Sequence, residues 1–414
     1  MARLQPVRGT HDLLPEQARA FRRVADAARG VAERYGYHEM ATPIFEFSEV
    51  FKRTLGDTSD IVTKEMYTFA DRSGAEITLR PEGTAGVARA VISGGLAQHM
   101  PLKYFYAGPM FRYERPQKGR LRQFHQIGVE LLGVAEPLGD IEAIALGAAT
   151  LDALGVSGQV TLELNTLGNA ASRAAYRELL VDYFEARRGE LSRDSLDRLA
   201  RNPLRILDSK NPGDRAAIAG APTLGDSLDA ESADFFASVR DGLDRLGIAY
   251  AVNPRLVRGL DYYCHTAFEF TTDALGAQGA VIAGGRYDGL VGQMGGPETP
   301  GVGWAGGIER LSMLAGAPEP PPRPIALIPI GPRAEAETLV LADRLRRAGF
   351  AIELGYRGNL SRRLSRADRV NARAAVILGE DELARDMATV RDLDSGAQDE
   401  VPLAALADRL AGLS

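Results

Sequence analysis

A short basic loop is well suited to a polyanionic ligand. Between positions 112 and 122 of the segment FRYERPQKGRLRQFHQIGVE (111–130), five basic side chains stand against one acid, Glu114, which gives a local net charge of +4 in a chain of formal net charge −6. Guanidinium groups match the geometry of phosphate oxygens and stay charged at any working pH, which favours a phosphate ligand. A solvated turn is the alternative interpretation. The basic residues of the loop are Arg112, Arg115, Lys118, Arg120 and Arg122.

The strand expected directly after this loop carries a polar pair on one face. A period of two sends Gln126, Gly128 and Glu130 to the same side, together with Phe124 and Leu132. The glycine between the two polar side chains leaves room for a small ligand that the carboxylate would bind. A solvated face with a glycine bulge is the simpler interpretation of this strand taken alone. The opposite face, which we expect to lie in the core, holds His125, Ile127, Val129 and Leu131.

The segment ITLRPEGTAGVARA (77–90) places Arg80, Glu82 and Thr84 at a strand-to-helix turn. Side chains and backbone N–H groups can converge on a ligand at such a turn. A glutamate near a helix N-terminus is also a common way to start a helix, so a purely structural role is the alternative.

The segment LVRGLDYYCHTAFEF (256–270) places Arg258 just before a strand that we expect to begin with Tyr262 and Tyr263. Neighbouring residues of a strand face opposite sides. One of the two tyrosines is therefore expected to line a pocket while the other packs in the core.

The segment GVGWAGGIERL (301–311) contains an isolated G-x-G-x-x-G pattern. The dinucleotide-binding fingerprint also needs a second strand that ends in an acid about 20 residues further on, but here a helix leads directly into prolines around Glu319. We interpret the segment instead as a glycine-rich strand that lets a nucleotide lie close to the backbone, with Arg310 on the next helix reaching its phosphates. The chain contains neither a P-loop motif nor a G-x-S-x-G nucleophile elbow.

The elements that would position these residues form a large first domain. From Pro15, apolar residues recur at the spacing of an amphipathic helix. Several of the strands are separated by hairpin-length loops, so we expect an antiparallel sheet with helices between some strands. The pattern between about 168 and 250 is helical and predicts an insertion within this domain. The expected strands lie at 77–81, 104–114, 123–133, 160–165, 262–270 and 279–285.

The proline run in GAPEPPPRP (316–324) marks a domain boundary, because it can continue neither a helix nor a central strand. After it, strand and helix patterns alternate, which predicts a small α/β domain with a mostly parallel sheet. Six arginines stand against Asp368 between positions 357 and 373. A helix from about 359 would align four of them, Arg362, Arg366, Arg369 and Arg373, on one face. Its other face, expected to pack on the sheet, holds Leu360, Leu364, Ala367 and Val370.

Length and composition exclude several classes of protein. The 414 residues suit two or three domains, and 45% apolar and 25% charged residues are typical of a soluble globular protein. The N-terminus has no apolar core of a signal peptide and no later run approaches a membrane span, so we expect a cytoplasmic protein without membrane contact. A single cysteine, Cys264, excludes an internal disulfide, and the five histidines lie far apart, so we expect no protein-bound metal.

Together these segments resemble the histidyl-tRNA synthetase family, which belongs to the class II aminoacyl-tRNA synthetases, along essentially the whole chain. RGTHDLLP (8–15) is similar to the family's N-terminal signature. TPIFE (42–46), FRYERPQKGRLRQFHQ (111–126) and GVGWAGGIERL resemble the three class motifs. LRPEGT (79–84) and LVRGLDYY (256–263) are similar to the two elements that distinguish the histidine enzymes within the class. All of these segments occur in the expected order.

The resemblance implies an α+β catalytic core with an antiparallel sheet at 1–320, which dimerises through the first class motif. It also implies a helical insertion at 168–250 and an α/β anticodon-binding domain at 324–414. The implied activity is that of a homodimeric histidine–tRNA ligase, which activates L-histidine with ATP and transfers it to tRNA(His). Mg²⁺ would accompany the ATP phosphates.

The resemblance also assigns roles to the matching residues. Glu82, Thr84 and Gln126 would hold the substrate ammonium, and Glu130 with Tyr263 would contact the imidazole. The full histidine site would comprise Glu82, Gly83, Thr84, Arg112, Gln126, Glu130, Arg258, Tyr262 and Tyr263. The ATP site would comprise Arg112, Glu114, Arg120, Phe124 and Arg310. The catalytic residues would be Arg112, Arg258 and Arg310. Contacts to tRNA would come from Arg115, Gln117, Arg362, Arg366 and Arg369.

The chemistry agrees with these roles. Attack of a carboxylate on the α-phosphate brings two anions together, so catalysis must come from positioning and from fixed positive charge, which Arg258 would supply by contacting both groups. The attacking carboxylate is already ionised at pH 7 and needs no general base.

Two other functions are compatible with parts of the pattern. A regulatory subunit of ATP phosphoribosyltransferase would resemble the catalytic core, but such proteins generally lack the anticodon domain. A nucleic-acid-binding scaffold would not need an intact amino-acid pocket. The three arginines and the C-terminal domain favour the enzyme.

Overall fold

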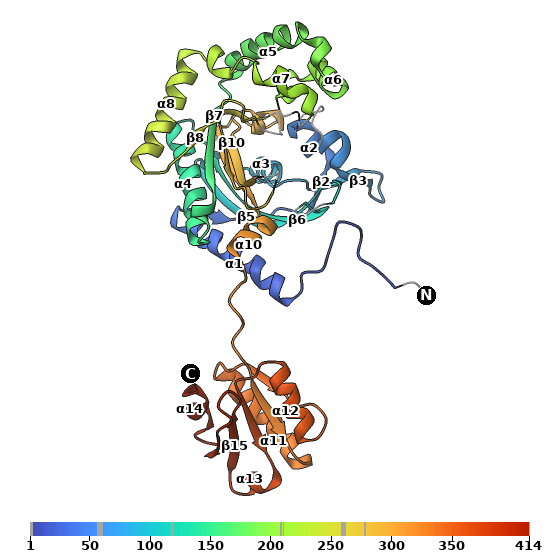
Figure 1. The fold of residues 1–414 in the computed structure, drawn as a ribbon, viewed down its shortest axis with the longest axis vertical. Coiled ribbons are helices and arrows are strands. Elements are labelled where there is room, and N and C mark those ends of the chain that lie inside the picture. The colour runs from blue at the N-terminus through green and yellow to red at the C-terminus, as the bar shows by residue number, and fades with distance from the viewer. Residues whose placement is uncertain are drawn as a thin grey trace. The chain divides into compact units, whose positions relative to one another are not determined.

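The computed structural model describes residues 3–55, 61–116, 120–207, 209, 211–257, 262–276 and 279–413. The chain divides into two compact units, Met1–Pro318 and Glu319–Ser414 (Figure 1). In the part of the chain that is described, no helix is long and apolar enough to cross a membrane.

An eight-stranded sheet forms the centre of the first unit. Its six inner strands pair antiparallel, as predicted, while the two-residue strands at the edges pair in parallel. In spatial order the strands are β1 (His38–Glu39), β5 (Leu102–Phe111), β6 (Gln123–Leu132), β11 (Gly301–Gly307), β10 (Ala280–Arg286), β9 (Cys264–Thr271), β7 (Thr161–Thr166) and β8 (Ala251–Val252).

One face of this sheet carries the main hydrophobic core. Ile127, Val129 and Leu131 of β6 point into it, as the period of two predicts. The helices that supply the rest of this core appear on one side of the sheet in Figure 1. They are α1 (Pro15–Arg34), α4 (Pro137–Ala153), α8 (Ala230–Arg245) and α10 (Ile308–Ala315).

The other face carries a second core that surrounds the predicted site. Tyr106 of β5, Leu132 of β6 and Ala267 of β9 contribute to it, with Phe124 packed at its edge. Its helices are α2 (Ser48–Leu55), α3 (Thr84–Ser93) and α9 (Leu290–Gln293). A separate antiparallel sheet leads into α3 and has the order β2 (Phe45–Phe47), β4 (Glu76–Leu79) and β3 (Tyr67–Ala70).

The helical segment between β7 and β8 has a core of its own, which runs from Tyr176 to Leu224. Its last helix differs from the others, because Val239 and Leu243 of α8 belong to the main core. The remaining helices are α5 (Ala170–Glu185), α6 (Arg193–Arg201) and α7 (Arg215–Ala219).

The second unit is a five-stranded sheet with helices, and only part of it is parallel. β12 pairs in parallel with β13 and β14, but β15 and β16 continue the sheet antiparallel. The prediction of a mostly parallel sheet missed this polar hairpin. The strands are β13 (Ile352–Leu354), β12 (Ile325–Pro329), β14 (Ala374–Leu378), β15 (Met387–Asp392) and β16 (Gln398–Pro402). The helices are α11 (Pro332–Arg347), α12 (Leu360–Arg369), α13 (Glu380–Ala384) and α14 (Leu406–Ala411).

Candidate functional site

The centre of the site is the carboxylate of Glu130 on β6, which is only 1% exposed. Three hydroxyl groups donate to it from three separate segments. Thr84 Oγ1 donates to Oε1 over 2.7 Å, Tyr106 donates to the same oxygen over 3.3 Å, and Tyr287 donates to Oε2. Glu130 and Thr84 were predicted, but the two tyrosines were not.

Glu82 starts the helix that carries Thr84. Its Oε2 accepts the backbone N–H of Thr84 over 2.7 Å, and its Oε1 accepts that of Ala85 over 2.9 Å. The carboxylate therefore satisfies two of the free N–H groups at the start of α3. This is the structural role that was the alternative for Glu82, and it leaves further lone pairs for a ligand. Arg80 is likewise structural, because it donates to the carbonyl oxygens of Thr42 and Pro109.

Two glycines form a slot for the ring of Tyr106. A Cβ atom on Gly83 or on Gly128 would lie 2.3 Å from the Tyr106 ring, a contact that no side chain tolerates. The expectation that Gly128 leaves room for a ligand is therefore wrong, because the protein's own tyrosine fills that space.

The glycines of β11 serve the same site. A Cβ on Gly303 would lie 2.1 Å from Oε2 of Glu130, and one on Gly301 would lie 2.3 Å from the ring of Tyr287. Contacts within the protein therefore explain why both positions are glycine. A nucleotide lying against the backbone is not needed to explain them.

Burial controls the ionisation of the groups around Glu130. It raises the pKa of Glu130 to about 8, while the hydroxyl of Thr84, followed by that of Tyr287, acts in the opposite direction. Burial also raises the pKa of Glu82. The pKa values of Tyr106 and Tyr287 are raised well above their ordinary value, mainly by burial, so both hydroxyls keep their protons and can donate.

Gln126 lies on the same face of β6, toward its start. Its Oε1 is buried and has no hydrogen-bond partner among the described residues. An unpaired buried acceptor costs free energy unless a ligand supplies the donor. The role of Gln126 in binding a ligand stays a prediction.

The basic loop before β6 brings four of the predicted residues together. The guanidinium of Arg112 lies 5.3 Å from the ring centre of Phe124 and donates to the carbonyl oxygen of Pro81 over 2.9 Å. Glu114 is buried, forms an ion pair with Arg120, and lies 3.9 Å from Arg112. The positive charge of the loop is thus partly neutralised within the loop itself.

Arg310 lies at the start of α10, as predicted. Its Nε and Nη2 atoms are buried and have no hydrogen-bond partner among the described residues. Burial lowers its pKa from the ordinary value, and the nearby charge of Arg120 lowers it further. Glu309 fixes this helix start to β6 by accepting the backbone N–H of His125 over 2.9 Å. The unused donors of Arg310, close to the charge of Arg120, make a place for an anion.

The two adjacent tyrosines do not behave as predicted. They precede β9 instead of beginning it, and their rings contact each other with centres 4.6 Å apart. Tyr262 and Tyr263 both lie in the core around the site, so the expectation that they face opposite sides is wrong. The irregular backbone before Cys264 turns both rings to one side.

Three of the predicted residues lie outside the described residues, namely Arg258, Gln117 and Lys118. Arg115 is exposed.

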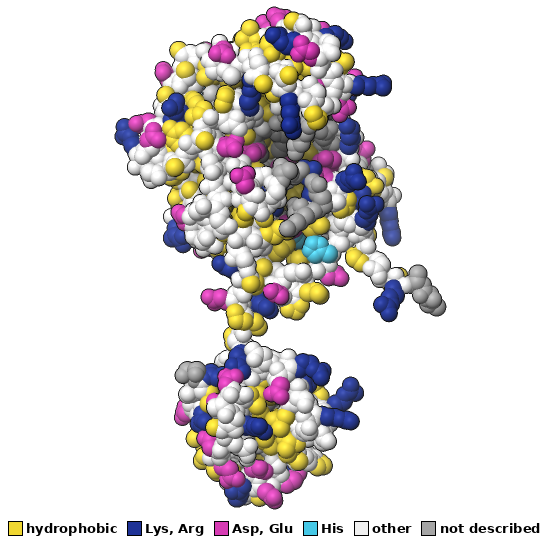
Figure 2. All heavy atoms as spheres, viewed as in Figure 1, with side chains coloured by type: hydrophobic (Ala, Val, Ile, Leu, Met, Phe, Trp, Pro, Cys, Tyr) yellow, Lys and Arg dark blue, Asp and Glu magenta, His cyan; other side chains and the backbone are white. Residues whose placement is uncertain are grey.

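The predicted arginine stripe of the second unit is shorter than expected. α12 ends at Arg369, where Asn371 with a φ of 53° leaves the helical conformation, so Arg373 lies beyond the helix. Arg362, Arg366 and Arg369 are exposed, and Arg366 pairs with Glu353. Figure 2 shows basic side chains gathered on the side of this unit where α12 lies in Figure 1.

The prediction of an apolar face on α12 is confirmed in part. Ala367 is buried, and Leu364 and Val370 pack beside it. The expectation for Leu360 is wrong, because it is 38% exposed in the first turn of the helix.

Tyr106 and Tyr287 were not predicted as site residues from the sequence. Tyr106 lies two residues before Gly108 on β5, opposite Gly128 in the antiparallel register. The same period of two that selected Glu130 would have put Tyr106 on the ligand face had the register been known. Tyr287 follows β10 in a turn, where no periodic pattern applies.

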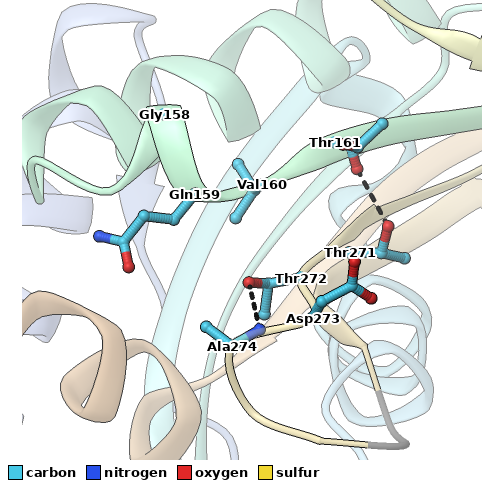
Figure 3. A pocket seen from close by; sticks show the side chains of 8 residues that line it. All are labelled: Gly158, Gln159, Val160, Thr161, Thr271, Thr272, Asp273 and Ala274. Atoms are coloured by element: carbon cyan, nitrogen blue, oxygen red, sulfur yellow. Dashed lines mark hydrogen bonds between the residues drawn. The ribbon is translucent and has the colours of Figure 1, made fainter.

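A hollow of about 420 Å³ lies elsewhere, beside the start of β7 and the end of β9 (Figure 3). It is lined by uncharged polar residues such as Gln159 and Thr272, with one acid, Asp273. It contains none of the predicted site residues and no arginine, so it lacks the features that a phosphate ligand needs.

Comparisons with known proteins identify the family of the chain. The family model described as histidyl-tRNA synthetase matches residues 9–311, and the one described as an anticodon binding domain matches residues 325–413. A protein named histidine–tRNA ligase from Rhodospirillum rubrum is 64% identical over 412 residues, which cover 99% of each chain. Its counterpart from Gluconacetobacter diazotrophicus is 58% identical over 414 residues and 100% of each chain.

Solved structures give the same result. Apo histidyl-tRNA synthetase from S. aureus matches with a TM-score of 0.82 and 34% identity over 98% of this chain and 99% of that one. A Bacillus halodurans structure described as an ATP phosphoribosyltransferase regulatory subunit/histidyl-tRNA synthetase has a TM-score of 0.67 over 91% of this chain and 98% of that one. At 23% identity it shows the fold alone. The predicted resemblance and fold class are confirmed: this chain belongs to the histidyl-tRNA synthetase family.

Proposed function

We propose that this chain is a histidine–tRNA ligase, which condenses L-histidine with ATP to histidyl adenylate and then esterifies tRNA(His). Family membership over the whole chain supports this activity. The observation that carries it is the pairing of β6 with β11. This pair places Glu130 opposite Gly303 and Gln126 opposite Gly307, next to the helix of Arg310. Glu130 and Gln126 are about 13 Å apart along the strand. This distance suits a ligand whose side chain lies at one end and whose phosphate lies at the other.

Each residue would have its own role in binding histidine or ATP. Glu130 would accept an N–H of the imidazole, and Glu82, Thr84 and Gln126 would bind the ammonium. Tyr263 would contact the ring from the other side, with Gly83 and Tyr262 lining the pocket. The phosphates would lie against the arginines, and Glu114 and Phe124 would hold the adenine. The arginines are Arg112, Arg120, Arg258 and Arg310.

The metal and the partners follow from this activity. The described residues contain no group of three or more His, Cys, Asp or Glu side chains that could hold a metal ion. Mg²⁺ would enter with the ATP phosphates and help to neutralise them. We also propose that the protein works in the cytoplasm as a homodimer that pairs through the segment around Pro43, with Arg115 and Gln117 contacting tRNA. The first unit, 1–320, would be the catalytic core with its insertion at 168–250, and 324–414 would bind the anticodon.

Histidine-dependent ATP–pyrophosphate exchange tests the activity directly. The full-length protein is expected to exchange label only when histidine and ATP are both present, and to charge tRNA(His) under the same conditions. A regulatory subunit would bind histidine without exchange, and a nucleic-acid-binding scaffold would bind tRNA without histidine. Either of these two results would contradict the proposed activity.

A further inference from the structure

Two tyrosines without an assigned role touch the residue at the centre of the histidine site. Tyr106 comes from β5 and Tyr287 from the turn after β10, yet both hydroxyls reach the Glu130 carboxylate, one on each oxygen. Thr84 supplies the third donor. We call these three hydroxyl groups the hydroxyl cage.

The backbone holds both rings in place. Gly83 and Gly128 leave a slot that the Tyr106 ring fills, and Gly301 does the same for Tyr287. Both rings are almost fully buried, at 5% and 2% exposure. A side chain held in this way cannot turn away when a ligand arrives, so its donor stays aimed at Glu130.

The cage opposes a strong penalty on the charged form of Glu130. Burial raises the pKa of this group to about 8, and the neighbouring Glu82 carboxylate adds to the increase. Hydroxyl donors favour the anion, because they donate to a carboxylate more strongly than to a neutral acid. Among the described residues, the other titratable groups whose charges interact with Glu130 or with its two tyrosines are Tyr37, Arg80, Glu82, Tyr262 and Tyr263.

We propose that Tyr106 and Tyr287 are positioning residues that make the site specific for a ring with an N–H group. They favour the carboxylate form of Glu130 over its protonated form and orient it, so that an N–H of the substrate ring can donate to a free lone pair. The inference rests on the proposed function, because it takes the ligand of Glu130 to be histidine. An acceptor oriented in this way leaves a cost for any ring that cannot donate, since the buried Glu130 would then lack the hydrogen bond from the substrate.

The test replaces each hydroxyl and keeps its ring. Tyr287→Phe and Tyr106→Phe retain the groups that fill the slots. Tyr176→Phe is the matched control, because its buried hydroxyl donates to the carbonyl oxygen of Pro222 over 3.0 Å, outside the site. Histidine-dependent pyrophosphate exchange and calorimetric histidine binding are measured from pH 6 to 9.5 with the full-length protein.

Loss of a hydrogen bond to a charged group should weaken the carboxylate form by about tenfold or more. We therefore expect kcat/KM for histidine at pH 7 to fall by about tenfold in each variant and to recover toward the wild-type value at high pH. The KM for ATP and the Tyr176→Phe control should not change. A uniform loss at all pH values would mean that the hydroxyls serve packing alone, and would overturn the inference.

A ring without an N–H group provides the second readout. β-(2-Thienyl)alanine has a similar shape but no ring donor. Its disadvantage relative to histidine in binding should shrink in both variants, because a protonated Glu130 is less costly beside an apolar ring. An unchanged ratio would also overturn the inference.

The two measurements separate the inference from the proposed function. Histidine binding without exchange in the wild type would contradict the activity, while the pH profile of binding would still test the cage. Absence of both binding and exchange would overturn both.

Discussion

At the scale of single residues, Arg310 has buried guanidinium nitrogens that donate no hydrogen bond to the described residues. Two of its nitrogens lack partners among the described residues, and the charge of Arg120 adds to the cost of its ionised form. A bound polyphosphate would supply the missing acceptors. The same contacts would strengthen as negative charge develops on the phosphate oxygens in the transition state.

Arg310→Ala is expected to lower kcat/KM for ATP in pyrophosphate exchange by about 10²–10³, the range for removing one transition-state donor. Arg310→Lys should restore little, because one ammonium group cannot replace two aligned guanidinium donors. The control is Arg245→Ala, which removes an exposed partner of Asp241. Equal exchange rates for Arg310→Ala and wild type would remove the residue from the mechanism.

The raised pKa of Glu130 implies that the stability of the folded protein depends on pH. Its pKa of about 8 in the folded protein lies above the ordinary value of 4.5, so between these values the folded state keeps a proton that the unfolded state has released. This contribution to stability is complete below about pH 4 and is lost as the pH rises through 8.

The Glu130→Gln variant has no titratable group at this position, so it has no proton to release as the pH rises. The Tm of the variant relative to wild type should therefore increase from pH 5.5 to pH 8.5, since each unit of pKa shift corresponds to about 1.4 kcal/mol. Scanning calorimetry at constant ionic strength measures this difference. A difference that does not change with pH would contradict the raised pKa.

The sequence pattern predicted Gln126, Glu130 and Thr84, but not the two tyrosine hydroxyls that donate to Glu130. The period of two on β6 put Gln126 and Glu130 on one face, and both lie at the site. Tyr106 and Tyr287 reach Glu130 only through the β5–β6 register and a turn after β10. Such long-range placement is not encoded in any local pattern.

At the scale of elements, α3 and β6 approach so closely that one aromatic ring separates Gly83 from Gly128. Gly128→Ala would place a methyl group into the Tyr106 ring, and neither side of the slot can yield easily. We expect a loss of about 1–3 kcal/mol in stability and a higher KM for histidine.

The matched control for this substitution is Gly30→Ala on α1, where a Cβ meets nothing within 4 Å. It should stabilise the protein slightly, by up to about 1 kcal/mol, because alanine favours a helix. Thermal melts and histidine titration compare the two variants. If both were tolerated equally, the slot would not be a constraint on the site.

The elements that the sequence missed depend on partners far along the chain. β1 and β8 are only two residues long and gain their hydrogen bonds by pairing with sheet strands. β16 buries only Val401 of its five residues, so its apolar period is too weak to predict a strand. α12 was predicted four residues too long, because the sequence did not reveal that Asn371 would end it.

At the scale of the whole molecule, the second unit has its own hydrophobic core. Buried residues from β12, α11, β14, β15 and α14 form one cluster, and a smaller cluster lies under α12. A chain that ends at Pro318 should therefore fold and retain histidine-dependent exchange, while its kcat/KM for charging tRNA(His) falls steeply. Loss of exchange together with charging would show that the first unit depends on the second.

The surface of α12 offers a sharper test of how the second unit meets tRNA. Ion pairs occupy two of its four arginines, because Arg366 contacts Glu353 and the buried Arg363 contacts Glu335. Arg362 and Arg369 are exposed and have no ion pair among the described residues. These two are therefore the guanidinium groups most available to a phosphate backbone, and the proposed role of Arg366 would require its pair with Glu353 to open.

Arg362→Glu combined with Arg369→Glu should weaken tRNA(His) binding and reduce the slope of log Kd against log salt by about two, one for each phosphate that an arginine no longer neutralises. The control is Arg385→Glu combined with Arg409→Glu, which changes the net charge equally but lies beside β16, where each arginine pairs with an acid. Breaking such exposed pairs costs little stability. The control should keep the wild-type slope, and both proteins should keep their discrimination among anticodons, because unstacked bases elsewhere in the unit would supply specificity. If the two double variants weakened binding equally, net charge would explain the effect, and the arginines of α12 would form an ordinary solvated face.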